Sequence, residues 1–366
     1  MAISDIAESL SRPRSATPIP AQPPTQARTA TSSQSRAANS LALSLYGVPL
    51  GLAGLGGGWS AASAMMGAPV WPGELLYALS AVLWLAFTGI YLWQGLAQRG
   101  KFSSDLRHPF AGPFVAFVPL VGVLLSAHYS EYLPVAGAWA TVIFIAALAI
   151  VAAQLFAHWL TGGVTMATIH PGYFLPAVAG SFVASIGLSS VHLHEAAIAA
   201  FGAGSFFWLV IGGVVMVRLM TGGTLPQAAK PTLSAFLAPP ATASIAWIAA
   251  HPGPMDAIQA LLTGVLVIMV VVQVVLIGEY RRLPFSMAFW IFTFPVAASA
   301  NYAIRWLAAS EVAGWRVWAA VVLGAATVFV IAVGAATIVS LGRRKVRLKV
   351  VTATSSSGLP SQTNRS

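Results

Sequence analysis

The chain has 366 residues, of which 57% are hydrophobic and only 8% are charged, and its mean hydropathy is +0.79. A soluble domain carries about 25% charged residues, so this composition excludes an ordinary solvated globular surface and indicates an integral membrane protein. The net charge of +10 would suggest a nucleic-acid partner in a soluble chain, but here it indicates basic loops at the cytoplasmic face, with no nucleic acid involved. The absence of cysteine excludes disulfides and thiolate chemistry.

Residues 1–40 are rich in Ser, Ala, Pro, Thr and Gln and predict a disordered cytoplasmic arm. Long apolar runs follow, and their continuity favours helices over the alternating strands of about 10 residues that build a membrane barrel. Residues 342–366 include "RRKVRLK" and predict a basic cytoplasmic tail. The domain between, residues 41–341, is predicted to be an all-α membrane domain of ten spans at 41–62, 73–97, 109–128, 134–159, 170–190, 194–220, 231–250, 255–279, 284–308 and 314–341.

The distribution of charge supports this count. With both termini in the cytoplasm, all but two of the 19 Lys and Arg residues lie on the inner side, the exceptions being Arg305 and Arg316. This is the asymmetry that the positive-inside rule predicts for a protein of the cell membrane. The outer loops carry acidic residues instead: Glu74, Glu131, Glu195, Asp256 and Glu311.

A repeat is visible in the prolines. Every odd-numbered span contains a proline followed by small residues, whereas even-numbered spans such as 142–156 are uniformly apolar. A proline in a helix interior kinks the helix, and broken helices are tolerated in membranes only where protein or a water-filled cavity covers them. The pattern predicts five helical hairpins, with kinked inner helices around a central pore and straight outer helices. Single prolines of this kind usually serve close helix packing, but five in register favour the pore. The predicted kinks are at Pro49, Pro119, Pro176, Pro240 and Pro295.

Four segments carry a family resemblance: "YGVPLGLAGL" (46–55), "HPGYFLPAVAGSFVAS" (170–185), "KPTLSAFLAPPATASIAW" (230–247) and "FSMAFWIFTFPVAASA" (285–300). They resemble the first, fifth, seventh and ninth helices of the tellurite-resistance/dicarboxylate transporter (TDT) family, which includes a bacterial tellurite-resistance channel homologue and the slow-type anion channels of plants. The resemblance implies five hairpins around a pore, a homotrimer, and passage of anions. It also implies that a phenylalanine of the ninth helix plugs the pore; Phe294 matches that position, with Phe292 as the alternative.

The ninth span presents one face built from residues at i, i+4, i+7 and i+11, namely Phe294, Ala298, Asn301 and Arg305. We expect this face to line the pore, with Arg305 concentrating anions at the outer mouth. The alternative for Arg305 is that it snorkels to the membrane interface. Small residues of other spans are also expected in the pore wall, namely Gly47, Gly51 and Gly180, although Gly47 and Gly51 form a Gly-x-x-x-Gly pair that usually indicates helix packing.

These observations predict an anion channel or uniporter for small inorganic or carboxylate anions in the lipid bilayer. All Asp and Glu residues lie in the arms or near helix ends, which argues against a proton-coupled symporter. The alternative function is a secondary carrier of malate or other C4-dicarboxylates, or an exporter of sulfite or tellurite. We predict no enzyme, no catalytic residues and no cofactor. "HLHE" (192–195) resembles a metal cluster, but it lacks further ligands at a recognisable spacing, so no metal site is expected.

Overall fold

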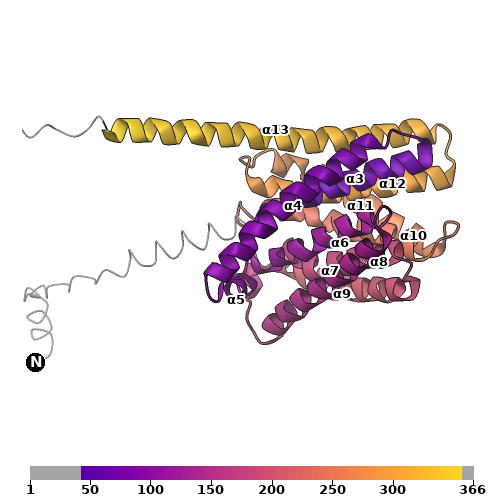
Figure 1. Ribbon diagram of the computed structural model, residues 1–366, viewed down its shortest axis with the longest axis horizontal. Coiled ribbons are helices and arrows are strands. Elements are labelled where there is room, and N and C mark those ends of the chain that lie inside the picture. The colour runs from indigo at the N-terminus through magenta and orange to yellow at the C-terminus, as the bar shows by residue number, and fades with distance from the viewer. Residues whose placement is uncertain (1–42, 357–366) are drawn as a thin grey trace, which may run out of the picture. The chain divides into compact units, whose positions relative to one another are not determined.

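The computed structural model describes residues 43–356, and the side chains of that range up to residue 343 (Figure 1). The predicted arm, residues 1–40, lies outside the described residues. The compact unit Ser40–Ser366 contains every described element, and all of these elements are helical. The all-α fold predicted from the sequence is therefore confirmed for the part of the chain that the structure describes.

Five hairpins follow one another along the chain. In each, an inner helix packs against the outer helix that follows it. A short helix, α5 (Lys101–Leu106), lies between the first two hairpins, and the third begins with three short helical turns, η2 (Met166–Thr168), η3 (Pro171–Tyr173) and η4 (Leu175–Ala179). The pairs are α3 (Gly47–Met66) with α4 (Trp71–Ala97), η1 (Gly112–Ala116) and α6 (Phe117–Tyr129) with α7 (Pro134–Leu160), α8 (Gly180–Ser190) with α9 (His194–Thr221), η5 (Lys230–Leu237) and α10 (Ala238–Ala250) with α11 (Ala257–Tyr280), and η6 (Met287–Phe292) and α12 (Thr293–Ser310) with α13 (Trp315–Ser356).

Nine helical segments of the described residues are long and apolar enough to cross a membrane. The remaining predicted span, 41–62, is the first along the chain and corresponds to α3. This helix has 20 residues but is not among the nine, because glycine and serine lower its hydropathy. At the other end, α13 continues past the predicted boundary at 341 to Ser356, so the predicted tail of 342–366 begins within a helix. Residues 357–366 lie outside the described range.

The helices form two layers. In the most apolar windows of the inner helices from the second to the fifth hairpin, 61–78% of the residues are buried, whereas the five outer helices bury 11–22%. The inner helices also contact one another in a closed order, α3–α6–α8–α10–α12 and back to α3. Apolar side chains exposed on the outer helices suit a lipid environment, and the ring of inner helices contains the core.

The prolines lie where an inner helix changes its winding. Pro49, Pro119, Pro240 and Pro295 are each the third residue of an α-helix, and Pro176 lies in the single π-helical turn η4. In α6, α10 and α12 the preceding residues form a 3₁₀ helix. The first four N–H groups of an α-helix lack intrahelical acceptors, so a proline in this turn costs little. The sequence suggested prolines in the interior of continuous helices. In the structure a new α-helix instead begins two residues before each of Pro49, Pro119, Pro240 and Pro295.

Glycines bring α3 and α12 together. A methyl group added at Gly51 would lie 1.9 Å from the Thr293 hydroxyl oxygen, and one added at Gly54 would lie 2.8 Å from Cδ2 of Phe294. Small residues of this kind allow two helices in a membrane to approach closely. The glycine-rich face of α3 therefore positions the first turn of α12, where Phe294 lies.

Two histidines fix the starts of inner helices. His170 is the N-cap of η3: its Nδ1 accepts a hydrogen bond from the Gly172 N–H, and its Nε2 lies 3.0 Å from the Phe110 carbonyl of the neighbouring inner helix. The Nδ1 of His108 likewise accepts from the Phe110 and Ala111 N–H groups. Each of these histidines directly precedes a proline, Pro109 and Pro171.

Candidate ion pathway

Two cavities lie within the ring of inner helices. The larger, which we call the vestibule, has a volume of about 550 Å³, and all five inner helices contribute to its wall. The smaller has a volume of about 30 Å³, roughly enough for one water molecule, and it too is lined from all five hairpins. Because each cavity touches the whole ring, both lie on its axis.

Phe294 separates these cavities. Among the described residues it is the only one that lines both of them. Its ring is buried, with 6% of the residue exposed, and it belongs to the same hydrophobic cluster as Leu50 of α3 and Leu120 of α6. Gly54 leaves the space that the ring occupies. An aromatic ring thus lies between the two axial cavities.

Phe292 lies elsewhere. Its ring packs against Tyr280 of α11 at a centroid distance of 4.7 Å, against Phe289 at 5.6 Å and against Phe329 of α13 at 6.5 Å. It lines neither cavity. Residues two apart on a helix point to roughly opposite sides, so when Phe294 faces the axis, Phe292 faces the outer layer.

The predicted face of α12 continues along the vestibule, where Ala298, Asn301 and Arg305 line the wall. Arg305 Nε donates a hydrogen bond of 2.9 Å to Asn301 Oδ1, which holds the guanidinium against the wall. In the part of the chain that the structure describes, no carboxylate lies within 4.0 Å of Arg305. Its charge therefore faces the vestibule without a direct counter-ion.

The three predicted wall glycines have different surroundings. Gly47 lines the smaller cavity, and a methyl group there would lie 3.3 Å from the Trp290 Cβ. Gly51 faces Thr293, and a methyl group added at Gly180 would lie 3.3 Å from Leu148 Cδ2 on the outer helix α7. Gly51 and Gly180 line neither cavity. At these two positions the absence of a side chain serves helix packing.

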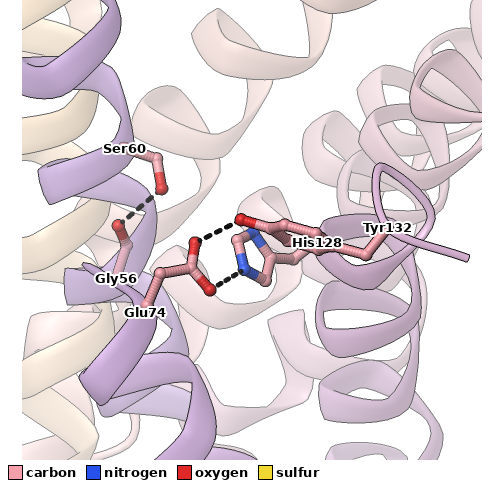
Figure 2. A network of polar contacts seen from close by, with 5 residues as sticks. All are labelled: Gly56, Ser60, Glu74, His128 and Tyr132. Atoms are coloured by element: carbon pink, nitrogen blue, oxygen red, sulfur yellow. Dashed lines mark hydrogen bonds and ion pairs between the residues drawn. The ribbon is translucent and has the colours of Figure 1, made fainter. Parts of the chain in front are cut away.

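A titratable cluster, which the sequence analysis did not predict, also lines the vestibule (Figure 2). His128 Nε2 at the end of α6 lies 3.3 Å from Glu74 Oε2 in the first turn of α4. The His128 ring stacks on Tyr77 at a centroid distance of 3.7 Å and an interplanar angle of 7°. Tyr132 Oη donates to Glu74 Oε1 at 3.0 Å, and this hydrogen bond raises the pKa of Tyr132. From sequence, Glu74 is only an acidic residue of an outer loop, and its partner lies 54 positions away.

The two histidines of the "HLHE" segment do not lie together. The rings of His192 and His194 are 6.4 Å apart, and no group of three potential ligands with metal-binding geometry occurs among the described residues.

Residues 40–338 match the family described as voltage-dependent anion channel (SLAC1). The chain belongs to this family. It is 28% identical to the S-type anion channel SLAH2 of Arabidopsis thaliana over 266 residues, which are 71% of this chain and 50% of that protein. It is 23% identical to the tellurite resistance protein TehA homolog of Haemophilus influenzae over 275 residues, 75% of this chain and 84% of that protein.

The match to a third relative, the S-type anion channel SLAH3 of Arabidopsis thaliana, is 26% identical and covers 74% of this chain and 43% of that protein. The chain thus matches about half of the length of the plant relatives. The family assignment agrees with the resemblance to the TDT family and to plant slow-type anion channels. It identifies the chain as a multi-pass membrane protein of a family of anion channels and transporters.

Proposed function

We propose that the chain forms a pathway for small anions along the axis of the inner ring, and that Phe294 closes it. The observation that carries this proposal is that Phe294 alone, among the described residues, lines both axial cavities. A bulky apolar side chain at a narrow point blocks ions by steric exclusion and by dewetting. Opening then requires the ring to leave the axis.

Selection of anions is supported by one feature, the positive charge that Arg305 supplies in the wall of the vestibule. Weak attraction of this kind favours anions without holding them tightly, which suits a channel for monovalent anions.

A test compares two equal deletions on one helix. We expect Phe294→Ala in liposomes to raise chloride and nitrate conductance by about tenfold or more, because the aromatic barrier on the axis is removed. Phe292→Ala removes the same group from the last residue of η6, directly before α12, where it faces the outer layer, and is expected to leave conductance unchanged. Equal conductance of the two variants would refute the assignment of Phe294 as the gate.

A second function, secondary transport of malate or other C4-dicarboxylates or export of sulfite or tellurite, is favoured by one observation. The vestibule, with a volume of about 550 Å³, carries an acidic and a basic side chain side by side in its wall, Glu74 and His128. Counterflow measurements separate the two functions: a carrier accelerates uptake of labelled malate when unlabelled malate is trapped inside, and a channel does not.

We also propose that the protein lies in the cell membrane with both termini in the cytoplasm, and that it assembles as a homotrimer. The topology rests on the distribution of Lys and Arg, and the trimer on family resemblance. Because the chain lacks cysteine, the single substitutions Glu195→Cys and Arg282→Cys show directly which side of the membrane each position faces. A membrane-impermeant thiol reagent should label the first from outside intact cells and the second only after lysis, and chemical cross-linking should stop at three copies.

A further inference from the structure

The wall of the vestibule carries a charge that disfavours anions. Its charged residues are Arg305 on α12, Glu74 on α4 and Glu131 just beyond α6. When His128 is neutral, one positive charge stands against two negative charges, a net −1. A single charge in such a cavity changes the local concentration of a monovalent anion severalfold. A pathway for anions therefore calls for a means of lowering this negative charge.

We propose that the Glu74–His128 pair is a proton-binding site that controls anion access to the vestibule. This inference rests on the proposed anion pathway. In the neutral ring, Nε2–H donates to Glu74 Oε2 and the added proton binds at Nδ1, so the pair stays together while its net charge rises from −1 to 0. The net charge of the whole wall then rises from −1 to 0, and anions enter more readily as the pH on the vestibule side falls.

The surroundings of His128 support a role in proton binding. From α4 it contacts Glu74 and Tyr77, and around its own helix end it contacts Tyr129 and Tyr132, while Glu131 lines the same vestibule. Across the vestibule, α12 presents Arg305. The helices α3, α8 and α10 contain no titratable residue, and on α7 the only one is His158, near the opposite end. Histidine is the side chain that ordinarily changes charge between pH 5 and 8.

A chain of contacts links this pair to Arg305. Tyr77 stacks on His128, and both the Tyr77 hydroxyl and the Asn301 amide border Gly57: a methyl group there would lie 3.3 Å from the first and 3.0 Å from the second. Asn301 in turn accepts the hydrogen bond from Arg305 Nε. The proton-binding pair and the vestibule cation thus belong to one continuous wall.

The test uses Phe294→Ala as a conducting background in liposomes. When the pH on the vestibule side falls from about 8 to about 5.5, we expect chloride flux to rise about two- to sixfold, the effect of one charge about 8 Å from the anion in a partly solvated cavity. His128→Gln in this background should abolish the rise, because glutamine keeps a donor for Glu74 but binds no proton. Glu74→Gln should raise flux already at pH 8.

His194→Gln is the matched control, because His194 is an exposed histidine at the same end of the bundle that lines neither cavity. It should keep the full pH response. A response that persists in the His128→Gln variant, or is lost equally in the His194→Gln variant, would overturn the proton site and leave the anion pathway standing. Absence of chloride and nitrate flux at every pH in the Phe294→Ala background would overturn the proposed function itself, and with it this inference.

Discussion

Replacing Arg305 by glutamine tests whether the vestibule attracts anions through this side chain. Arg305 faces the vestibule without a carboxylate within 4.0 Å in the described chain, and its Nε donates to Asn301. Glutamine keeps a donor for the Asn301 oxygen while it removes the charge. The substitution therefore isolates the electrostatic contribution from the structural one.

The magnitude follows from Coulomb's law. An anion about 5 Å from the guanidinium gains about 0.8 kcal/mol at the dielectric constant of water and about 3 kcal/mol at an effective value of 20. A solvated vestibule with protein walls lies between these limits, so about 1 to 2 kcal/mol is expected. This energy corresponds to a loss of about five- to thirtyfold in anion occupancy at low anion concentration.

The assay is chloride conductance of the Phe294→Ala protein as a function of chloride concentration, at low and high ionic strength. We expect Arg305→Gln to lower conductance at low chloride and to converge with the parent at high chloride, where screening and saturation remove the advantage of the charge. Arg305→Lys should retain most of the effect. Arg316→Gln removes an arginine that stacks on Trp315 outside the vestibule and is the matched control. Equal losses in the Arg305→Gln and Arg316→Gln variants would refute the reasoning.

Two further predictions concern stability, measured as the thermal midpoint in detergent. Gly51→Ala places a methyl group 1.9 Å from the Thr293 hydroxyl oxygen, and this overpacking should destabilise the folded protein by about 1–3 kcal/mol. The control Gly264→Ala meets nothing within 4 Å and should leave stability unchanged or raise it. Equal thermal midpoints of the two variants would contradict the close approach of α3 and α12. Lys101 and Asp105 form a buried ion pair of 3.1 Å, so Lys101→Met should destabilise the folded protein by about 3–5 kcal/mol because it leaves the Asp105 charge buried and unpaired. The double variant Lys101→Met/Asp105→Leu should recover most of that stability. No recovery would show that the unpaired charge is not the cause of the loss.

The helical architecture could be predicted from the sequence because each helix corresponds to a pattern along the chain. Apolar runs of sufficient length predict the helices, and small residues beside a proline mark those of the inner ring. The sequence alone does not decide whether Phe292 or Phe294 faces the axis, since a helical projection shows only that the two side chains point to different sides. Contacts of Phe292 with Tyr280 and Phe329 decide which side is outward, and these lie on two other helices.

The Glu74–His128 pair in the vestibule is a second feature that could not be predicted from the sequence. Glu74 and His128 have no recognisable spacing, and each alone is typical of a helix end. Their approach depends on the packing of α4 against α6, two helices that the sequence does not show to be neighbours. A count of charges near helix ends cannot distinguish a carboxylate in solvent from one that lines a cavity, so the sequence alone does not show that Glu74 faces the vestibule.

The unequal size of the two axial cavities has an electrical consequence. In the proposed pathway, water and ions in the larger vestibule conduct, whereas the Phe294 ring blocks the passage of ions, so most of a membrane potential falls across that ring. An anion on this pathway would cross nearly the whole voltage in the single step past the ring. A proton that binds at the proposed His128 site would cross almost none of it. The proposed proton site would then respond to the acidity of the compartment that the vestibule faces, and the step past Phe294 to the voltage.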